Sequence, residues 1–228
     1  AYEACRLTLK HMTPVILLSD GFIANGAEPW KLPVVGDLPD ISVPYRREAE
    51  AFEPYSRDPQ TLARPWAIPG TPGLEHRVGG LEKQEGSGDV SYDPLNHERM
   101  VHLRAEKVAR VADDIPLAEP VGDPAGDLLV IGWGSTYGAI TSAVRRARAE
   151  GKSVSQLHLR HLNPFPRNLG DVLDRYKQIL VPEINLGQLS FLLKARFVKP
   201  VIGQNKVQGS PFAADEILLK IDEILETC

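Results

Sequence analysis

The stretch that decides the fold is Leu128-Leu129-Val130-Ile131-Gly132-Trp133-Gly134-Ser135-Thr136-Tyr137-Gly138, which lies in the second half of a chain of 228 residues. Its apolar first part predicts a strand. The glycines and small polar residues that follow predict a tight turn. Ala139–Glu150 then has the pattern of a helix, which Gly151 is suited to end. The sequence therefore predicts that an α/β domain begins here.

Strands and helices alternate regularly from this point to the C-terminus. The expected strands are Leu128–Gly132, Val154–Leu162, Gln178–Ile184 and Pro200–Ile202. The expected helices are Ala139–Glu150, Asn168–Tyr176, Leu186–Phe197 and Phe212–Leu225. Such alternation indicates a parallel sheet with right-handed crossovers, and the expected fold class is α/β.

The first half of the chain has a different character. Tyr2–His11 reads as the end of a helix, and the apolar run Pro14–Ser19 predicts a strand that needs neighbours to complete a sheet. Pro29–Pro72 is rich in proline, which disrupts both helix interiors and sheet ladders, so an irregular segment is expected there. Disorder is the alternative, and the interleaved tryptophans and other aromatic residues argue against it.

Three shorter segments complete the expected organisation. Gly70–Gly88 is rich in glycine and predicts turns around a short hairpin. Asp93 and Pro94 have the residue types preferred at the beginning of a helix, here running to about Asp113. Ile115–Gly126 reads as a linker. The expected division is therefore into residues 1–116 and residues 127–228.

Composition excludes several classes of function. The net charge of -4 and the pI of about 5.9 give no electrostatic basis for binding nucleic acid or an anionic membrane. No apolar run reaches the roughly 20 residues that a membrane helix requires. The two cysteines, Cys5 and Cys228, have no metal-ligand spacing and fit a reducing cytoplasm.

The glycine turn Gly132–Gly138 has the spacing GxGxxxG, which is related to the dinucleotide-binding fingerprint. A nucleotide site also needs an acidic residue at the end of the second strand, and Ser155–His161 contains none. The favoured interpretation is a tight connection without a ligand. The alternatives are a nucleotide-binding or regulatory module that uses this turn, and a contact with an anion or a partner.

Candidate site residues are few. Asp20 and Asn185 each follow an expected strand, where sites form in α/β proteins, although Asn185 is also suited to cap the next helix. Glu75 and His76 lie in the glycine-rich segment and form the acid and base pair with the most plausible chemistry. The spacing of the histidines predicts no metal site.

Several stretches closely resemble the α subunit of the 2-oxoacid:ferredoxin oxidoreductases, over essentially the whole chain and in the same order. They are Pro14–Gly26, Arg64–Trp66, Pro72–His76, His161–Pro166, Pro182–Leu189 and Asn205–Gly209. Gly79–Lys83 and Ser91–Pro94 resemble the 2-oxoglutarate:ferredoxin oxidoreductase (2-oxoglutarate synthase) branch. The resemblance implies that residues 1–116 are the end of a thiamine pyrimidine-binding domain with a proline-rich wrap and a linker helix. It implies that residues 127–228 form a transketolase C-terminal-like domain.

The function that the resemblance implies is oxidative decarboxylation of a 2-oxoacid, expected to be 2-oxoglutarate, to an acyl-coenzyme A with reduction of ferredoxin. The implied cofactors are thiamine diphosphate with Mg²⁺ at an active site shared with a β subunit, and an iron–sulfur cluster in that β subunit. The family's Tyr-Pro-Ile-Thr-Pro substrate motif is absent here, so we expect the chain alone to be inactive. We expect Glu75 and His76 to act in catalysis, and Asp20, Gly21 and Asn185 to contact the cofactor.

Overall fold

The computed structural model describes residues 1–227 and divides into two compact units. The first unit consists of Ala1–Leu17 and Pro29–Asp114. The second consists of Leu18–Glu28 and the residues from Ile115 onward. The short segment Leu18–Glu28 thus packs with the later part of the chain, which no local pattern in the sequence indicates. The assignment of the two parts to pyrimidine-binding and transketolase-like domains stays a prediction.

The second unit is built on a four-stranded parallel sheet, which confirms the predicted fold class. Its strands are β3 (Gly126–Gly132), β4 (Val154–His158), β5 (Tyr176–Glu183) and β6 (Ile202–Asn205), in the order β4-β3-β5-β6. β4 is shorter than predicted because its last partner is Gly132, where β3 gives way to the glycine turn. β6 is an edge strand that pairs only with the carboxyl-terminal half of β5.

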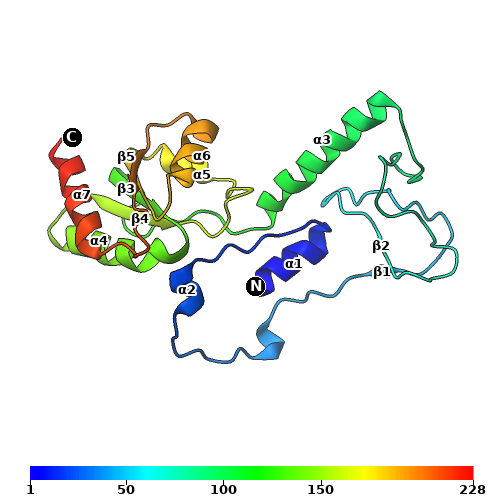
Figure 1. Ribbon diagram of the computed structural model, residues 1–228, viewed down its shortest axis with the longest axis horizontal. Helices are drawn as coiled ribbons and strands as arrows, with labels where there is room; N and C mark the ends of the chain where they lie inside the picture. Colours follow the sequence, from blue (N-terminus) through cyan, green and yellow to red (C-terminus); the bar gives the residue numbers. More distant parts are fainter. Residues whose placement is uncertain (228) are drawn as a thin grey trace. The chain divides into compact units, whose positions relative to one another are not determined.

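Helices cover both faces of this sheet (Figure 1). They are α4 (Tyr137–Ala149), α5 (Leu169–Leu173), α6 (Gln188–Phe197) and α7 (Ala214–Glu226). Alternate residues of β3 point to opposite faces: Leu128 and Val130 pack with α4 and α7, and Leu129 and Ile131 pack with α5 and α6. The continuous apolar run in the sequence is therefore explained by a strand that is buried on both faces.

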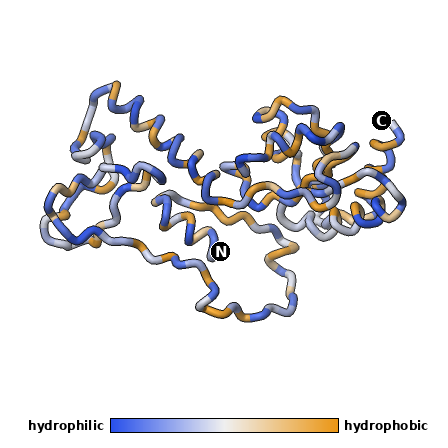
Figure 2. Tube along the Cα trace, turned by 180° about the vertical axis from the view of Figure 1, so that it is seen from behind, coloured by the Kyte–Doolittle hydropathy of each residue, from blue (hydrophilic) through white to orange (hydrophobic). Residues whose placement is uncertain are grey.

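The first unit has little regular structure. Its helices are α1 (Tyr2–His11) and α3 (Pro94–Arg110), the latter continuing into the 3-10 turn Val111–Asp113. α3 begins as predicted, because the Asp93 side chain accepts a hydrogen bond from Leu95 N at 3.0 Å and Pro94 occupies the first turn. Polar and apolar residues alternate along α3 (Figure 2).

The proline-rich segment of the first unit is mostly irregular, as expected. It contains only the 3-10 turn Val35–Asp37 and two short strands, β1 (Tyr45–Arg46) and β2 (Trp66–Ala67), which pair in parallel. In the glycine-rich segment, the structure contains an isolated antiparallel bridge between Lys83 and Val90 in place of the predicted hairpin.

The predicted strand Pro14–Ser19 is wrong. The backbone is not helical there, but no strand of residues 1–227 pairs with it, and a strand needs a neighbour for its N–H and C=O groups. Ile16 is 82% exposed and Leu17 is 64% exposed. The residues that follow this segment contain a short helix, α2 (Gly21–Asn25). Within residues 1–227, no helix is both long enough and apolar enough to cross a membrane.

Candidate functional site at the carboxyl edge of the sheet

The glycine turn after β3 is shaped by packing. A Cβ atom on Gly132 would lie 2.3 Å from Ile140 Cδ1 and 2.7 Å from Thr136 Oγ1. Both are far inside van der Waals contact, so a side chain at this position would force the side chains of Ile140 and Thr136 to move. Gly134 has a φ of 58°, in the left-handed region that favours glycine. These two glycines are thus explained without a bound nucleotide, as the favoured interpretation of the motif expects.

The Asp20 carboxylate lies against this turn. Its Oδ2 accepts a hydrogen bond from Ser135 N at 3.2 Å, and its Oδ1 accepts one from Ile23 N at 3.0 Å, which caps α2. Burial acts to raise the pKa of Asp20, but the hydrogen bonds from Ser135 and Ile23 prevail and hold the pKa below its ordinary value. A backbone amide of the glycine turn therefore already faces an anion, and that anion is a side chain of the same unit.

Glu183, the last residue of β5, is fully buried. Its Oε1 accepts hydrogen bonds from Ser190 N at 2.9 Å and Ser190 Oγ at 2.8 Å. Its Oε2 accepts one from Leu189 N at 2.8 Å and a longer one from Trp133 Nε1 at 3.4 Å. The carboxylate thus satisfies the free amides at the beginning of α6 and ties them to the turn after β3.

Asn185 begins the connection from β5 to α6. Its Oδ1 accepts hydrogen bonds from Gly187 N at 2.7 Å and Gln188 N at 3.2 Å, which forms a turn just before α6, but the N-cap position itself is Gly187 and not Asn185. Gly187 has a φ of 94°, and a Cβ there would lie 3.0 Å from Asn205 Nδ2 at the end of β6. The exits of β5 and β6 are therefore in direct contact. A cofactor contact by Asn185 stays a prediction.

His158 completes this edge at the end of β4. Its ring meets that of Tyr137 edge-on, with centroids 5.0 Å apart. Burial, and to a smaller extent the charge of Arg160, lower the pKa of His158 below its ordinary value. The imidazole is therefore neutral near pH 7. The carboxyl edge of the sheet thus brings together two carboxylates, Asp20 and Glu183, with an amide and a neutral imidazole, at the place where sites form in parallel sheets.

The other predicted site residues lie in the first unit. Glu75 is exposed and His76 is half-buried, and both line a cavity of about 410 Å³. His76 Nδ1 lies 2.8 Å from Leu74 O, and because a carbonyl only accepts, Nδ1 carries the proton. Nε2 is then the lone-pair nitrogen of the neutral ring. Phe52 fixes the ring from the side, with centroids 5.4 Å apart.

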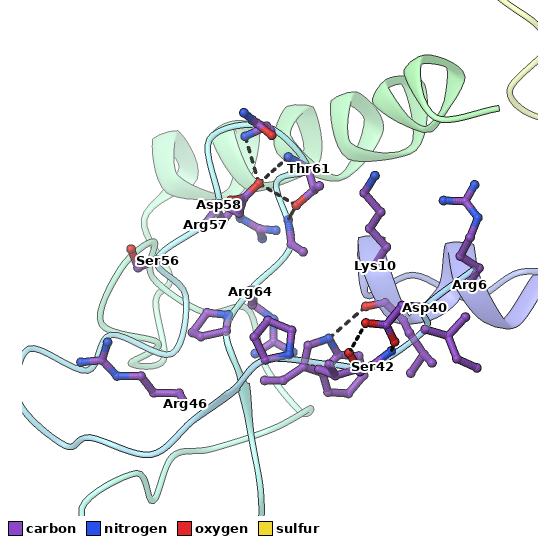
Figure 3. A pocket seen from close by; sticks show the side chains of 18 of the residues that line it. Arg6, Lys10, Asp40, Ser42, Arg46, Ser56, Arg57, Asp58, Thr61 and Arg64 are labelled. Atoms are coloured by element: carbon purple, nitrogen blue, oxygen red, sulfur yellow. Dashed lines mark hydrogen bonds between the residues drawn. The ribbon is translucent and has the colours of Figure 1, made fainter. Parts of the chain in front are cut away.

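A second cavity of the first unit, of about 750 Å³, has several charged lining residues that bind other groups of the protein, and its lining also includes Arg57 and Arg64 (Figure 3). Arg6 and Lys10 of α1 bind Asp114 at 3.0 and 2.7 Å. Asp40 accepts hydrogen bonds from Ser42 N and Ser42 Oγ, each at 2.8 Å. We therefore assign no reaction to this cavity. Of the predicted residues, the structure groups Asp20, Gly21 and Asn185 in one unit and Glu75 with His76 in the other.

Sequence reasoning placed Glu183 with Asn185 at the carboxyl end of a parallel strand, where sites form, but missed its structural role. Its partners Leu189 and Ser190 are six and seven residues away, and Trp133 is 50 residues away. Gly21 is the first residue of α2, and a Cβ there would meet open space, so packing does not require glycine at this position.

Comparison with known proteins gives concordant results in sequence and in structure. The model for pyruvate:ferredoxin oxidoreductase core domain II matches residues 126–209. The 2-oxoglutarate oxidoreductase subunit KorA of Mycobacterium tuberculosis is 54% identical over 95% of this chain and 33% of that protein. The 2-oxoglutarate synthase subunit KorA of Methanothermobacter marburgensis is 26% identical over 96% of this chain and 58% of that protein.

A solved structure extends this similarity to the fold. The 2-oxoglutarate:ferredoxin oxidoreductase from Magnetococcus marinus, with 2-oxoglutarate, coenzyme A and succinyl-CoA bound, superposes with a TM-score of 0.89 at 30% identity. The match covers 96% of this chain and 39% of that one. The chain therefore spans about a third of the length of the Mycobacterium relative and about two fifths of the solved chain.

Proposed function

We infer that the chain is part of an α subunit of the 2-oxoacid:ferredoxin oxidoreductase family, and we propose that it serves the oxidative decarboxylation of 2-oxoglutarate. The products are succinyl-coenzyme A, carbon dioxide and reduced ferredoxin. The observation that carries the proposal is the TM-score of 0.89 over 96% of the chain to a 2-oxoglutarate:ferredoxin oxidoreductase. The identity of 54% to a 2-oxoglutarate oxidoreductase subunit supports the choice of substrate.

The proposal assigns the metal-dependent chemistry to other parts of the assembly. Among residues 1–227, no three His, Cys, Asp or Glu side chains are grouped so that they could hold a metal ion, and Cys5 is exposed and free. These residues do not fit an iron–sulfur cluster or a Mg²⁺ site built by this chain alone. We place the cluster in a β subunit and thiamine diphosphate with Mg²⁺ between that subunit and the complete α subunit, in the cytoplasm.

The part that we propose for this chain is to shape and complete the shared active site. Asp20, Gly21 and Asn185 lie at or beside the carboxyl edge of the parallel sheet, which supports their proposed contact with the cofactor. His76 has a fixed ring with its lone pair on Nε2, and Glu75 is beside it in the same cavity. This arrangement supports a proton-transfer role for the pair.

The activity is tested with the complete α subunit that contains this chain, co-expressed with the β subunit. We expect reduction of ferredoxin that requires both 2-oxoglutarate and coenzyme A, and that is lost when either is left out. Reduction of ferredoxin with pyruvate or a branched 2-oxoacid, but not with 2-oxoglutarate, would contradict the proposed substrate. No reduction with any 2-oxoacid by an assembled, cofactor-loaded complex would contradict the proposed reaction.

The roles of Glu75 and His76 are tested in the same complex. We expect Glu75→Gln and His76→Gln to lower kcat by about 10²-fold or more, the contribution typical of a positioned acid or base, while assembly is unchanged. The matched controls are Glu50→Gln and His102→Gln, because both side chains are exposed on the same unit. A kcat equal to that of the controls would mean that the pair has no catalytic role.

The alternative of a nucleotide site at Gly132–Gly138 has its own test. Titration of the chain with NAD, NADP or FAD is expected to give no binding in the low-micromolar range, because Gly132 is required by packing and Ser135 N is bonded to Asp20. Binding in that range would favour the nucleotide-binding module instead, provided that Gly134→Val abolishes it whether or not Asp20 is also substituted.

A further inference from the structure

A third cavity of the first unit, of about 370 Å³, concentrates positive charge. Its charged lining residues are Arg57, Arg64, Lys83, Arg104, Lys107 and Glu82. Five cations thus surround one acid in a cavity of the size range of small-molecule sites, which is about 300–1,000 Å³. The residues come from the proline-rich segment, the glycine-rich segment and α3, which the sequence does not relate to one another.

Most of these cations are held by neutral groups. Four donate hydrogen bonds to backbone carbonyl oxygens: Lys83 to Gly79 at 2.6 Å, Lys107 to Met12 at 2.8 Å, Arg57 to Leu62 at 3.0 Å and Arg64 to Pro54 at 3.4 Å. A carbonyl oxygen fixes the side chain but does not cancel its charge. Arg64 also stacks over the ring of Tyr55, 4.6 Å from its centroid. The geometry of the cluster is therefore fixed without being neutralised.

Glu82, the single acidic residue among those that line the cavity, already binds two basic side chains. Glu82 accepts hydrogen bonds from His97 at 2.6 Å and from Arg104 at 3.0 Å. These two contacts lower the pKa of Glu82, so it is ionised at neutral pH. Its one negative charge is shared with Arg104 and His97, which leaves Arg57, Arg64, Lys83 and Lys107 without a carboxylate partner in the lining.

Two further observations indicate that these cations lack a negatively charged partner. The Nε atom of Arg57 is buried, and none of the described groups accepts its proton. Buried guanidinium donors are rarely left unpaired. Burial, together with the charges of Arg57 and Arg64, lowers the pKa of Lys107 to about 8. The cations therefore repel one another in the absence of an anion.

We propose that this cavity is a binding site for a doubly charged anion of the phosphate class. Guanidinium groups bind phosphate oxygens in a bidentate manner, and a lysine adds a point charge. A dianion balances two of the four cations that have no carboxylate partner in the lining, whereas a single carboxylate balances one. The cavity is lined entirely by the first unit and includes neither Glu75 nor His76, so it is separate from the cavity of that pair; it shares Arg57 and Arg64 with the cavity of about 750 Å³.

The test uses the chain of 228 residues, with inorganic phosphate as the probe. Binding is measured by titration calorimetry at low ionic strength and near neutral pH. We expect saturable binding of one phosphate. Arg64→Gln and Lys107→Met should weaken it about tenfold or more, since each removes a charged contact. Arg64→Lys should retain most of the affinity, and Arg47→Gln, an exposed arginine outside the cavity in the same unit, should not change it.

A second readout reports the site directly. The pKa of Lys107, followed through its side-chain NMR signals, should rise when phosphate is added, because the anion stabilises the charged amine. Absence of saturable binding at millimolar phosphate by the folded chain would overturn the proposal, as would equal binding by the Arg64→Gln and Arg47→Gln variants. Acetate binding as tightly as phosphate would overturn the phosphate assignment and identify a carboxylate site.

Discussion

The two units of this chain are stabilised by different kinds of interaction. In the second unit, backbone hydrogen bonds form a parallel ladder, and Leu128, Leu129, Val130 and Ile131 of its central strand have no exposed surface. In the first unit, the described regular structure consists of two longer helices, two 3-10 turns and two-residue strands. Large apolar side chains such as Trp30 and Ile16 are 73% and 82% exposed there. The second unit therefore has a continuous core, and the first has only a sparse one.

Side chains replace the backbone ladder in the first unit. Trp66 Nε1 donates to Leu9 O at 3.0 Å, and Tyr2 donates to Pro39 O at 2.6 Å. The long cationic side chains around the phosphate-class site do the same. The reason is that proline lacks an N–H but keeps its carbonyl, so a proline-rich segment contains more acceptors than its own backbone can satisfy. Basic side chains are therefore structural here and still leave their charge available for a ligand.

The largest expected effect tests the difference in core packing. Leu180→Ala, on a fully buried residue of β5, should lower the free energy of unfolding of the second unit by about 2–5 kcal/mol. Ile16→Ala in the first unit should change stability by less than about 0.5 kcal/mol, because that side chain is 82% exposed. Urea unfolding followed by NMR separates the two units. Similar losses in the two variants would contradict the comparison.

The buried carboxylate of the second unit gives the next effect. Glu183→Gln should cost about 1–3 kcal/mol, because the glutamine NH₂ group would face donors that now bond to a carboxylate oxygen. Chemical denaturation measures the loss, and the indole N–H signal of Trp133 should shift at the same time. As a control, Glu119→Gln changes an exposed acid of the same unit. Equal stability of both variants would show that the Glu183 network is not structural.

The glycine turn offers a matched pair. Gly132→Ala should destabilise the second unit by about 1–3 kcal/mol, since the added Cβ would lie 2.3 Å from Ile140 Cδ1. Gly138→Ala meets no atom within 4 Å and lies in α4, so it should be neutral or stabilising by up to about 1 kcal/mol. Thermal unfolding compares them. A neutral Gly132→Ala would mean that packing does not explain the motif.

The smallest effect concerns the ion network of the first unit. Burial acts to raise the pKa of Asp114, but hydrogen bonds from Lys10, His11 and Arg6 prevail and lower it below 3.8. A carboxylate with a lowered pKa stabilises the fold above its unfolded pKa and loses this contribution as the pH falls through the folded value. Asp114→Asn should therefore cost about 1 kcal/mol at pH 7 and show a weaker loss of stability on acidification below pH 4. Parallel pH profiles of the two proteins would contradict this.

The sequence predicted the second unit well because its signals are local. The apolar run of β3, the glycines after it and Gly151 after α4 each specify backbone conformation through neighbouring residues. In the first unit, the same reasoning found α1 and the beginning of α3 but predicted a strand at Pro14–Ser19 that the structure does not contain. Whether an apolar extended segment becomes a strand depends on a neighbour, and the sequence of the segment does not specify one.

The candidate site was predictable only in part. The strand exit with Asn185 could be located because parallel strands place their carboxyl ends at one edge, whereas the strand expected before Asp20 does not exist within residues 1–227. The contact between Asp20 and Ser135 could not be predicted, because it joins residues 115 positions apart. The same holds for the link from Glu183 to Trp133. Short-range patterns specify helices, turns and strands, but which side chain satisfies a given buried amide depends on the packing of the whole unit.

The amino-acid sequence alone predicts an α/β part with a parallel sheet and an irregular proline-rich part, and it resembles one family of oxidoreductases. The tertiary structure alone decided that Leu18–Glu28 packs with the second unit, that Glu183 ties two strand exits together and that five cations of the first unit converge on one cavity. The two differ because backbone preferences act over a few neighbouring residues in the sequence. Burial and charge instead act between any segments that the fold brings together.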